Sequence, residues 1–280
     1  MFFRLLYLVP KNYLSYIIGV IVHATLPFEI HLAIRNWFIG FFKVDTTESQ
    51  FPLAHYPTLG SFFIRQLKPG ARPIAPADII SPVDGTLTQG SRFTSPLPKL
   101  TQIKGIDYSL AELIGSKINS QDYISGSFLT IYLAPYNYHR IHSPITGEIS
   151  QVSYIPGALW PVNTWSVKNI PGLFVVNERI IVEVVGPLGK VLVVMVGATN
   201  VGRITLDFNT DIFGNGKPQA KTENWKPQST LPIQKGDGLG CFELGSTVIL
   251  IFSAALAEKI NSQYYNPVSQ VVRMGQGLSH

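Results

Sequence analysis

The stretch that most constrains the fold lies near the C-terminus, where Phe-Glu-Leu-Gly-Ser-Thr-Val-Ile-Leu-Ile-Phe occupies residues 242–252. Its second half is apolar and β-branched, which is typical of a buried strand over 247–252. The strand is entered through Gly245, which has no Cβ, so its carbonyl carbon can be approached closely. The Ser246 hydroxyl is expected in a nearly dry place beside a carbonyl that it can attack. The simpler interpretation is a turn into a core strand.

Short apolar segments separated by turns continue through most of the chain. Of the 280 residues, 46% are hydrophobic and only 14% are charged, and there are 20 prolines and 24 glycines. The usual charged fraction is about a quarter, so the composition favours many short strands over long solvated helices. Strands are predicted at residues 128–133, 145–154, 179–185, 190–196, 202–206 and 247–252.

Residues 1–43 differ from everything after them, because three apolar runs are punctuated there by basic residues. The middle run, 13–26, stops before Pro27 and is shorter than the roughly 20 residues of a spanning helix. Two or three short helices lying in the membrane interface are predicted, and the alternative is that they cap the soluble core. Residues 44–280 are predicted to form a β-rich catalytic domain.

The net charge and the cysteine content limit which binding partners and which compartment are expected. The net charge is +5, but the lysines and arginines are scattered and accompany no nucleic-acid motif. An acidic membrane surface is therefore favoured over nucleic acid. The single cysteine, Cys241, excludes an internal disulfide and fits a reducing compartment. The expected location is peripheral, on the cytoplasmic face of the cell membrane.

Two shorter segments carry local signals. Residues 59–73 look like a short amphipathic helix closed by Pro69-Gly70, where Arg65, Lys68 and Arg72 either hold a phosphate or, as slightly favoured, form a solvated face. Ser109 and Glu112 have the spacing of a capping box, which predicts a helix that ends near Gly115.

A faint repeat links two turns. Ser81-Pro82-Val83-Asp84-Gly85 and Ser143-Pro144-Ile145-Thr146-Gly147 share the pattern Ser-Pro-x-x-Gly, which predicts two similar hairpin corners. With Lys235-Gly236-Asp237, these corners resemble the flattened β-barrels of lipoyl and biotinyl carriers. The predicted fold is α+β, predominantly β, with an antiparallel barrel-sandwich-like core and N-terminal membrane-associated helices.

The densest polar cluster in an apolar neighbourhood surrounds His139 and His142. Two histidines three residues apart can share one face, but no third ligand of similar standing accompanies them, so a metal site is not favoured. Acid–base work suits a histidine better, with Asp84 as the candidate that fixes its tautomer. Asp84, His142 and Ser246 supply the three roles of a serine triad. Taken alone, Asp84 is interpreted equally well as a residue that stabilises its own turn through a hydrogen bond to the backbone.

Several phrases carry a resemblance to a known family. The longest are Leu244-Gly245-Ser246-Thr247, Tyr138-His139-Arg140-Ile141-His142 and Pro82-Val83-Asp84-Gly85, and shorter ones occur in order at 62–69, 156–159, 177–179, 196–199 and 273–276. Together they resemble the bacterial membrane-associated phosphatidylserine decarboxylases, which are pyruvoyl-dependent and self-processing. The chain departs from that pattern at Ser143, where methionine is common, and this change is expected to affect packing only.

The resemblance implies a self-made cofactor. Ser246, with His142 as base and Asp84 orienting it, would attack the Gly245 carbonyl and convert the peptide to an ester. Elimination would then leave dehydroalanine, and its hydrolysis would release ammonia and leave a covalent pyruvoyl group at residue 246. The products would be a β chain, 1–245, and an α chain, 246–280, held together as a heterodimer.

The resemblance also implies the reaction. The pyruvoyl carbonyl would form a Schiff base with phosphatidylserine, lose carbon dioxide and release phosphatidylethanolamine, the pyruvoyl acting as an electron sink. His139 is the candidate that positions the carboxylate or donates the proton, and its alternative is a structural partner of His142. By analogy, Leu159, Trp160 and Trp165 are expected at the mouth for the lipid.

Two other functions remain open from the residues alone. A membrane-associated serine hydrolase acting on lipids would use the same triad but keep its chain intact. A lipoyl-like carrier or binding module would share the predicted fold and need no triad.

The N-terminal region generates a first test. Deletion of residues 1–40 is expected to release the protein from membranes at moderate salt, because the apolar helices that enter the interface would be lost. Sedimentation of full-length and truncated protein with vesicles measures this. Unchanged sedimentation of the truncated protein would contradict the assignment.

Overall fold

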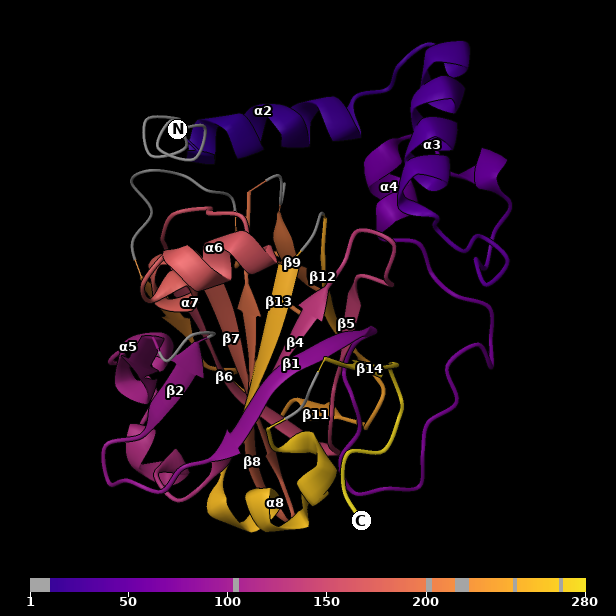
Figure 1. Ribbon diagram of the computed structural model, residues 1–280. Coiled ribbons are helices and arrows are strands. Elements are labelled where there is room, and N and C mark those ends of the chain that lie inside the picture. Colours follow the sequence, from indigo (N-terminus) through magenta and orange to yellow (C-terminus); the bar gives the residue numbers. More distant parts are fainter. Residues whose placement is uncertain (1–10, 103–105, 200–202, 215–221, 244–245, 267–268) are drawn as a thin grey trace.

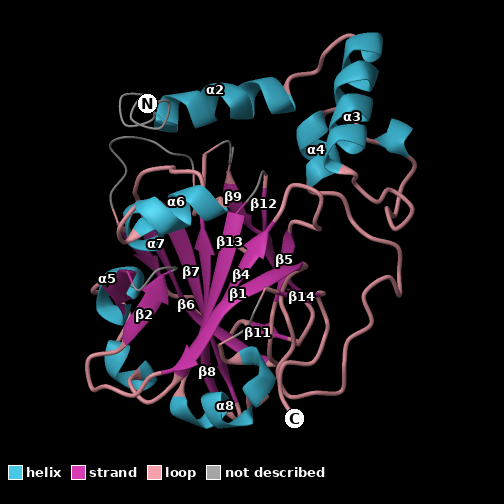
Figure 2. Cartoon of the chain, in the orientation of Figure 1, coloured by secondary structure: helices cyan, strands magenta, loops and turns pink. Residues whose placement is uncertain are grey.

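The computed structural model describes residues 11–102, 106–199, 203–214, 222–243, 246–266 and 269–280. Among these residues, one antiparallel sheet of nine strands dominates (Figures 1 and 2). Its order is β10-β6-β7-β8-β13-β4-β1-β14, and β11 pairs with β6. The strands are β1 (Gly85–Arg92), β4 (Ser127–Leu133), β6 (Gly147–Ile155), β7 (Arg179–Gly186), β8 (Gly189–Val196), β10 (Glu223–Trp225), β11 (Pro232–Ile233), β13 (Ser246–Phe252) and β14 (Gln270–Val272).

Strand β13 occupies the interior of this sheet. It pairs with β4 from Ser246 opposite Leu133 onward, and with β8 from Thr247 onward. All seven of its side chains are buried. An apolar run with no polar alternation has no face to offer to water, so it is stable only with neighbours on both edges and cover on both faces. The predicted strand is confirmed, with one residue added at its start, and the other predicted strands are confirmed to within two residues.

The expectation of a barrel-sandwich core was wrong. The large sheet is open, because its order begins at β10 and ends at β14 with no pairing between them among the described residues. The short strands that would have closed it form a separate sheet in the order β5-β12-β9, and two further strands pair as a hairpin. These strands are β5 (Arg140–His142), β9 (Ile204–Leu206), β12 (Gly238–Phe242), β2 (Lys99–Gln102) and β3 (Ile106–Ser109).

The two repeated corners are confirmed as equivalent structures. In each, the serine hydroxyl donates to the carbonyl two residues on, at 2.7 Å in both cases, from Ser81 and from Ser143. The corners also bond to each other reciprocally, since the Ile80 N–H donates to the Pro144 carbonyl and the His142 N–H to the Pro82 carbonyl, both at 3.0 Å. This local pairing brings two segments about 60 residues apart in sequence together, as loop closure of that length allows at modest entropic cost.

Helices cover the sheet and its ends. The predicted capping box is confirmed, since the side chains of Ser109 and Glu112 each accept from the other's backbone N–H. Helices α6 and α7 lie over one face of the sheet, and α8 follows β13 at its far end (Figure 1). The short elements are α5 (Leu110–Ile114), α6 (Thr164–Asn169), α7 (Leu173–Val176), α8 (Ala254–Lys259), η1 (Leu53–His55), η2 (Ser120–Tyr123) and η3 (Ser262–Tyr264).

Three N-terminal helices stand at the end of the sheet where β13 begins: α2 (Lys11–His23), α3 (Phe28–Phe42) and α4 (Leu59–Phe63). Helix α2 lies across that end, and α3 packs on α4 to one side of it (Figure 1). Phe38 of α3 joins Phe62 and Phe63 of α4 in a hydrophobic cluster of their own. None of the described helices is long and apolar enough to cross a bilayer.

The central position of β13 generates a stability prediction. Leu250→Ala, at a fully buried side chain, is expected to lower the free energy of unfolding by about 2–5 kcal/mol, through lost burial and the cavity left behind. Urea unfolding followed by circular dichroism measures it. Leu97→Ala is the matched control, because Leu97 is 76% exposed and should change stability by less than about 0.5 kcal/mol. Equal losses in the two variants would contradict the assigned core.

Candidate active site

Ser246 begins β13 and is completely buried. Its hydroxyl has no hydrogen-bond partner among the described residues. A buried hydroxyl without a partner costs about 1–3 kcal/mol. The hydroxyls of Ser153 and Ser166 share this state, so what distinguishes Ser246 is its place at the entrance of an interior strand. Gly245, the other half of the predicted corner, lies outside the described residues. The structure therefore confirms the buried strand entrance, where the Ser246 hydroxyl oxygen has no hydrogen-bond partner among the described residues.

His142 is held as a neutral base by two contacts. Its Nδ1 donates to the Gly236 carbonyl at 2.7 Å, so its Nε2 carries the lone pair and accepts from the Tyr138 hydroxyl at 3.0 Å. Burial lowers the pKa of His142, and the bond to Gly236 opposes this only in part. The imidazole is therefore neutral at pH 7, with its tautomer fixed by a backbone carbonyl and not by a carboxylate.

Asp84 is buried, and its carboxylate faces a cation. Arg72 donates to it from Nε at 2.9 and 3.1 Å and from Nη2 at 2.6 Å, and the Met274 N–H adds a bond at 2.8 Å. Arg72 also binds Glu48, and these two carboxylates, Asp84 first, raise its pKa. The repeated corners bring Asp84 near His142, but the side chains of Asp84 and His142 hydrogen bond to other groups and not to each other. The Asp84 charge nevertheless acts on His142 and raises its pKa slightly.

His139 is a second neutral histidine, and it is completely buried. Its Nδ1 donates to the Asn137 carbonyl at 2.8 Å, while its Nε2 has no partner among the described residues. Burial lowers its pKa to about 3, and its ring packs on Phe63 with centroids 4.1 Å apart. The His139 carbonyl accepts from the Phe242 N–H, so the residue lies beside the end of β12, which leads to Ser246. A free lone pair is thus held close to the strand entrance.

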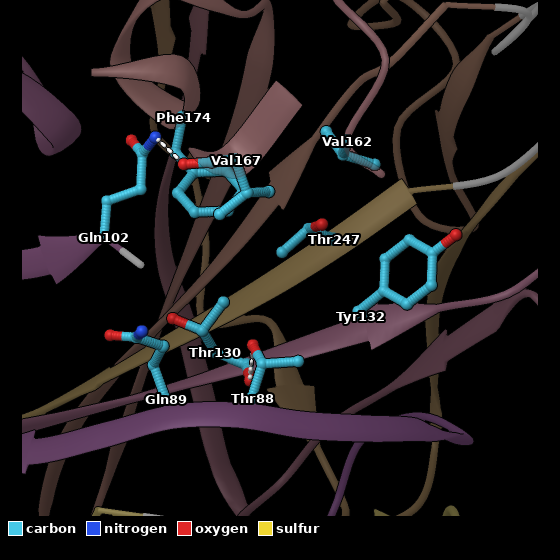
Figure 3. A pocket seen from close by; sticks show the side chains of 9 residues that line it. All are labelled: Thr88, Gln89, Gln102, Thr130, Tyr132, Val162, Val167, Phe174 and Thr247. Atoms are coloured by element: carbon cyan, nitrogen blue, oxygen red, sulfur yellow. Dashed lines mark hydrogen bonds between the residues drawn. The ribbon is translucent and has the colours of Figure 1, made fainter. Parts of the chain in front are cut away.

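A small cavity of about 60 Å³ opens on the other face of β13, where Thr247 points (Figure 3). Polar side chains of three adjacent strands line its floor, and α6 and α7 supply its apolar roof. A larger groove of about 360 Å³ runs between the N-terminal helices and the strand ends. Tyr132 and Val162 line both spaces, so the cavity and the groove are neighbours near the start of β13. The groove is lined mainly by apolar side chains, and the cavity is a small chamber with more hydroxyl and amide groups.

Sequence reasoning missed several residues of this site. The solvated face proposed for Arg65 and Arg72 was wrong, because the Arg65 residue is 4% exposed and the Arg72 side chain 7%. Leu159, Trp160 and Trp165, which were expected at the mouth, are not among the described residues that line the groove, although Pro161, Val162 and Asn163 beside them are. The mouth assignment stays a prediction. The available signal for Tyr132 was a hydroxyl within an otherwise apolar strand. Arg72 had no local signal, because its partners are distant in sequence.

The fold and the site describe a β-rich protein with a buried serine, Ser246, at the entrance of an interior strand, close to a groove that is lined mainly by apolar side chains. Residues 59–280 match the family model described as phosphatidylserine decarboxylase. The chain is 40% identical over 259 residues to a phosphatidylserine decarboxylase proenzyme of Anaeromyxobacter sp. (strain K), covering 92% of this chain and 91% of the relative. It is 42% identical over 254 residues to that of Brevibacillus brevis (89% and 88%) and 37% over 282 residues to that of Shewanella pealeana (98% and 96%). The chain belongs to the phosphatidylserine decarboxylase family, which confirms the resemblance and the decarboxylase class.

The Asp84–Arg72 contact generates a prediction about stability. Asp84→Asn is expected to lower the free energy of unfolding by about 3 kcal/mol, because a buried guanidinium loses one of its two counter-charges. Chemical denaturation measures the change. Glu48→Gln removes the other counter-charge, which is 27% exposed, and should cost about 1 kcal/mol or less. A larger loss in Glu48→Gln than in Asp84→Asn would reverse the assigned importance of the two carboxylates.

Proposed function

We propose that this chain cuts itself between Gly245 and Ser246, converts Ser246 to a pyruvoyl group and decarboxylates phosphatidylserine to phosphatidylethanolamine. The observation that carries the proposal is the buried Ser246 hydroxyl, which has no partner among the described residues at the entrance of an interior strand. The proenzyme names of the relatives support a processing step. The groove and the chamber, which share Tyr132 and Val162 as lining residues, support a substrate with an apolar tail and a polar head.

Self-processing uses only groups of this chain. Ser246 Oγ gives its proton to a histidine and bonds to the Gly245 carbonyl carbon, and the Ser246 nitrogen leaves, so an ester replaces the amide. Loss of the Ser246 α-proton expels the Gly245 carboxylate and leaves dehydroalanine. Water then replaces the nitrogen, which departs as ammonia. The products are a β chain, 1–245, and an α chain, 246–280, which remain paired as a heterodimer.

His142 is the proposed base for the first step, because its Nε2 holds a lone pair and its Nδ1 is anchored. Tyr138 must release that nitrogen as Ser246 approaches. Asp84 is proposed to act through its charge, which favours the imidazolium formed by proton transfer. His139 is assigned to decarboxylation: its unengaged Nε2 carries a lone pair, so it would first take up a proton that the substrate amine releases and then return it to the carbon that loses carbon dioxide.

The residues at the entrance fit a carbonyl cofactor at position 246, because the Ser246 oxygen is already dry and free of partners. When formed, the pyruvoyl group supplies an electron sink for the charge left by carbon dioxide. The chain supplies the surroundings: Tyr132 presents a phenol whose pKa burial raises, so it stays a hydrogen-bond donor at neutral pH. The dry chamber around Thr247 favours dispersal of the carboxylate charge.

The proposed setting is the cytoplasmic face of the cell membrane, with the N-terminal helices in the interface. One face of α2 exposes Tyr13, Tyr16, Ile17, Val20 and Ile21, each more than half exposed. Trp37 and Phe41 of α3 are also exposed, at 61% and 66%. A contiguous apolar and aromatic surface of this kind on the rim of the groove suits docking on lipid headgroups.

Processing is tested by intact mass and denaturing gels of the purified chain. Wild-type protein is expected as two fragments divided after Gly245, with the small one blocked to Edman sequencing and reducible by borohydride in the presence of an amine. Ser246→Ala should remain one inactive chain, and His142→Ala should accumulate precursor. His139→Ala should be cut but fail to release carbon dioxide. An uncut, active wild-type chain would support a serine hydrolase instead.

The pH dependence follows from the state of His142. The base is active when neutral, and burial holds its pKa below the ordinary 6.5. On the acid side, the rate of cutting should therefore fall as the pH drops below 6.5, when the imidazole takes up a proton. Precursor decay measured between pH 4.5 and 7 gives this acid limb. A midpoint above 6.5 would contradict His142 as the base.

A further inference from the structure

Helix α2 is attached at both ends to segments that border the candidate site. At its start, Asn12 Nδ2 donates to the Gly157 carbonyl at 3.1 Å and Oδ1 accepts from the Leu159 N–H at 3.1 Å. At its end, His23 Nε2 lies 2.9 Å from Glu243 Oε2. Figure 1 shows α2 as a bar across the end of the sheet. The helix with the exposed apolar face is thus tied to the segment that leads into Ser246.

The His23 end is packed closely from two sides. A Cβ on Gly60 of α4 would lie 2.4 Å from His23 Cε1, so only glycine leaves room for the ring there. On the other side Glu243, whose side chain is 12% exposed, is itself anchored, because its N–H donates to the Arg203 carbonyl at 2.9 Å. The contact is therefore a junction of three segments, in which the His23 side chain keeps 39% of its surface exposed.

The charges around His23 favour its protonated form. The hydrogen bond to Glu243 raises the pKa of His23, burial opposes it, the Glu243 charge raises it further, and Arg203 lowers it. Glu243 and Arg203 are the charged groups that face the ring, and α4 contributes only Gly60. Because the pKa in the folded protein lies above the ordinary 6.5, the ion pair is present below 6.5 and is lost as the pH rises through the raised value.

We propose that His23 is a positioning residue for self-processing, acting through Glu243 two residues before Gly245. The inference rests on the proposed function. Strand β13 holds the Ser246 side of the bond through its pairing with β4 and β8. The ion pair restrains the chain at Glu243, the last described residue before the proposed cut, and so would limit the freedom of the chain on that side of the bond. Restricting both reactants in this way is what raises the rate of an intramolecular attack.

The test follows precursor decay in full-length chains made by pulse-labelled cell-free translation and analysed on denaturing gels. His23→Ala and Glu243→Gln are each expected to slow cutting about fivefold, the factor that a partly exposed ion pair contributes. Lys259→Ala is the matched control. Lys259 lies on α8, at the far end of β13, and forms a 2.8 Å ion pair with Asp78. This substitution should leave the rate unchanged.

A pH profile separates positioning from a general loss of structure. In wild type the rate should fall as the pH rises through the raised pKa of His23, in addition to the acid limb of His142. His23→Lys keeps a cation that stays charged at these pH values, so it should restore the rate and remove the alkaline fall while keeping the acid limb. His23→Ala should be slow throughout and also lack the alkaline fall.

Two results would overturn the inference. A His23→Ala chain that is cut at the wild-type rate would show that the contact does not position the bond. An alkaline fall that persists in both His23→Lys and His23→Ala would assign that titration to another group. A wild-type chain that is never cut would instead overturn the proposed function itself, so the two failures are distinguishable.

Discussion

The pairing of β13 on both edges is the constraint on which the rest of the molecule depends. Seven consecutive buried residues pair with β4 on one side, and six of them, from Thr247 onward, pair with β8 on the other. That position holds the first residue of the strand, Ser246, in a rigid and dry place while the segment before it arrives from the small sheet. Reactive geometry at the entrance is therefore a by-product of placing an apolar strand at the centre.

Around that entrance the fold keeps ionisable groups in defined states by different means. His139 and His142 are neutral because they are buried, and each has Nδ1 anchored on a backbone carbonyl. Asp84, by contrast, is buried against Arg72. The lone pairs of two neutral histidines and the Asp84–Arg72 ion pair thus lie in one small region. The reciprocal hydrogen bonds between the repeated corners help to bring these groups together. Environments that separate acid–base groups in this way are typical of catalytic sites.

Much of this could be predicted from the sequence, where the signal was local. The strand after Gly245, the capping box at Ser109 and the equivalence of the corners at Ser81 and Ser143 follow from patterns within a few residues. Sheet closure and the partners of Asp84 could not be predicted, since both depend on contacts between distant segments. The lipoyl-like pattern describes corners, and corners of that kind occur in open sheets as well as closed ones.

The place of the proposed cut within the topology has a consequence for the life of the protein. Strand β14 follows the cut together with β13 and pairs with β1, so residues 246–280 cross the sheet at an interior and at an edge position. If the chain is cut there as proposed, the sheet could be rebuilt only by an encounter between two molecules, and the search would depend on concentration. Folding would then be encoded in the precursor alone, and the persistence of the cut form would be governed by its unfolding rate and not by an equilibrium within one chain.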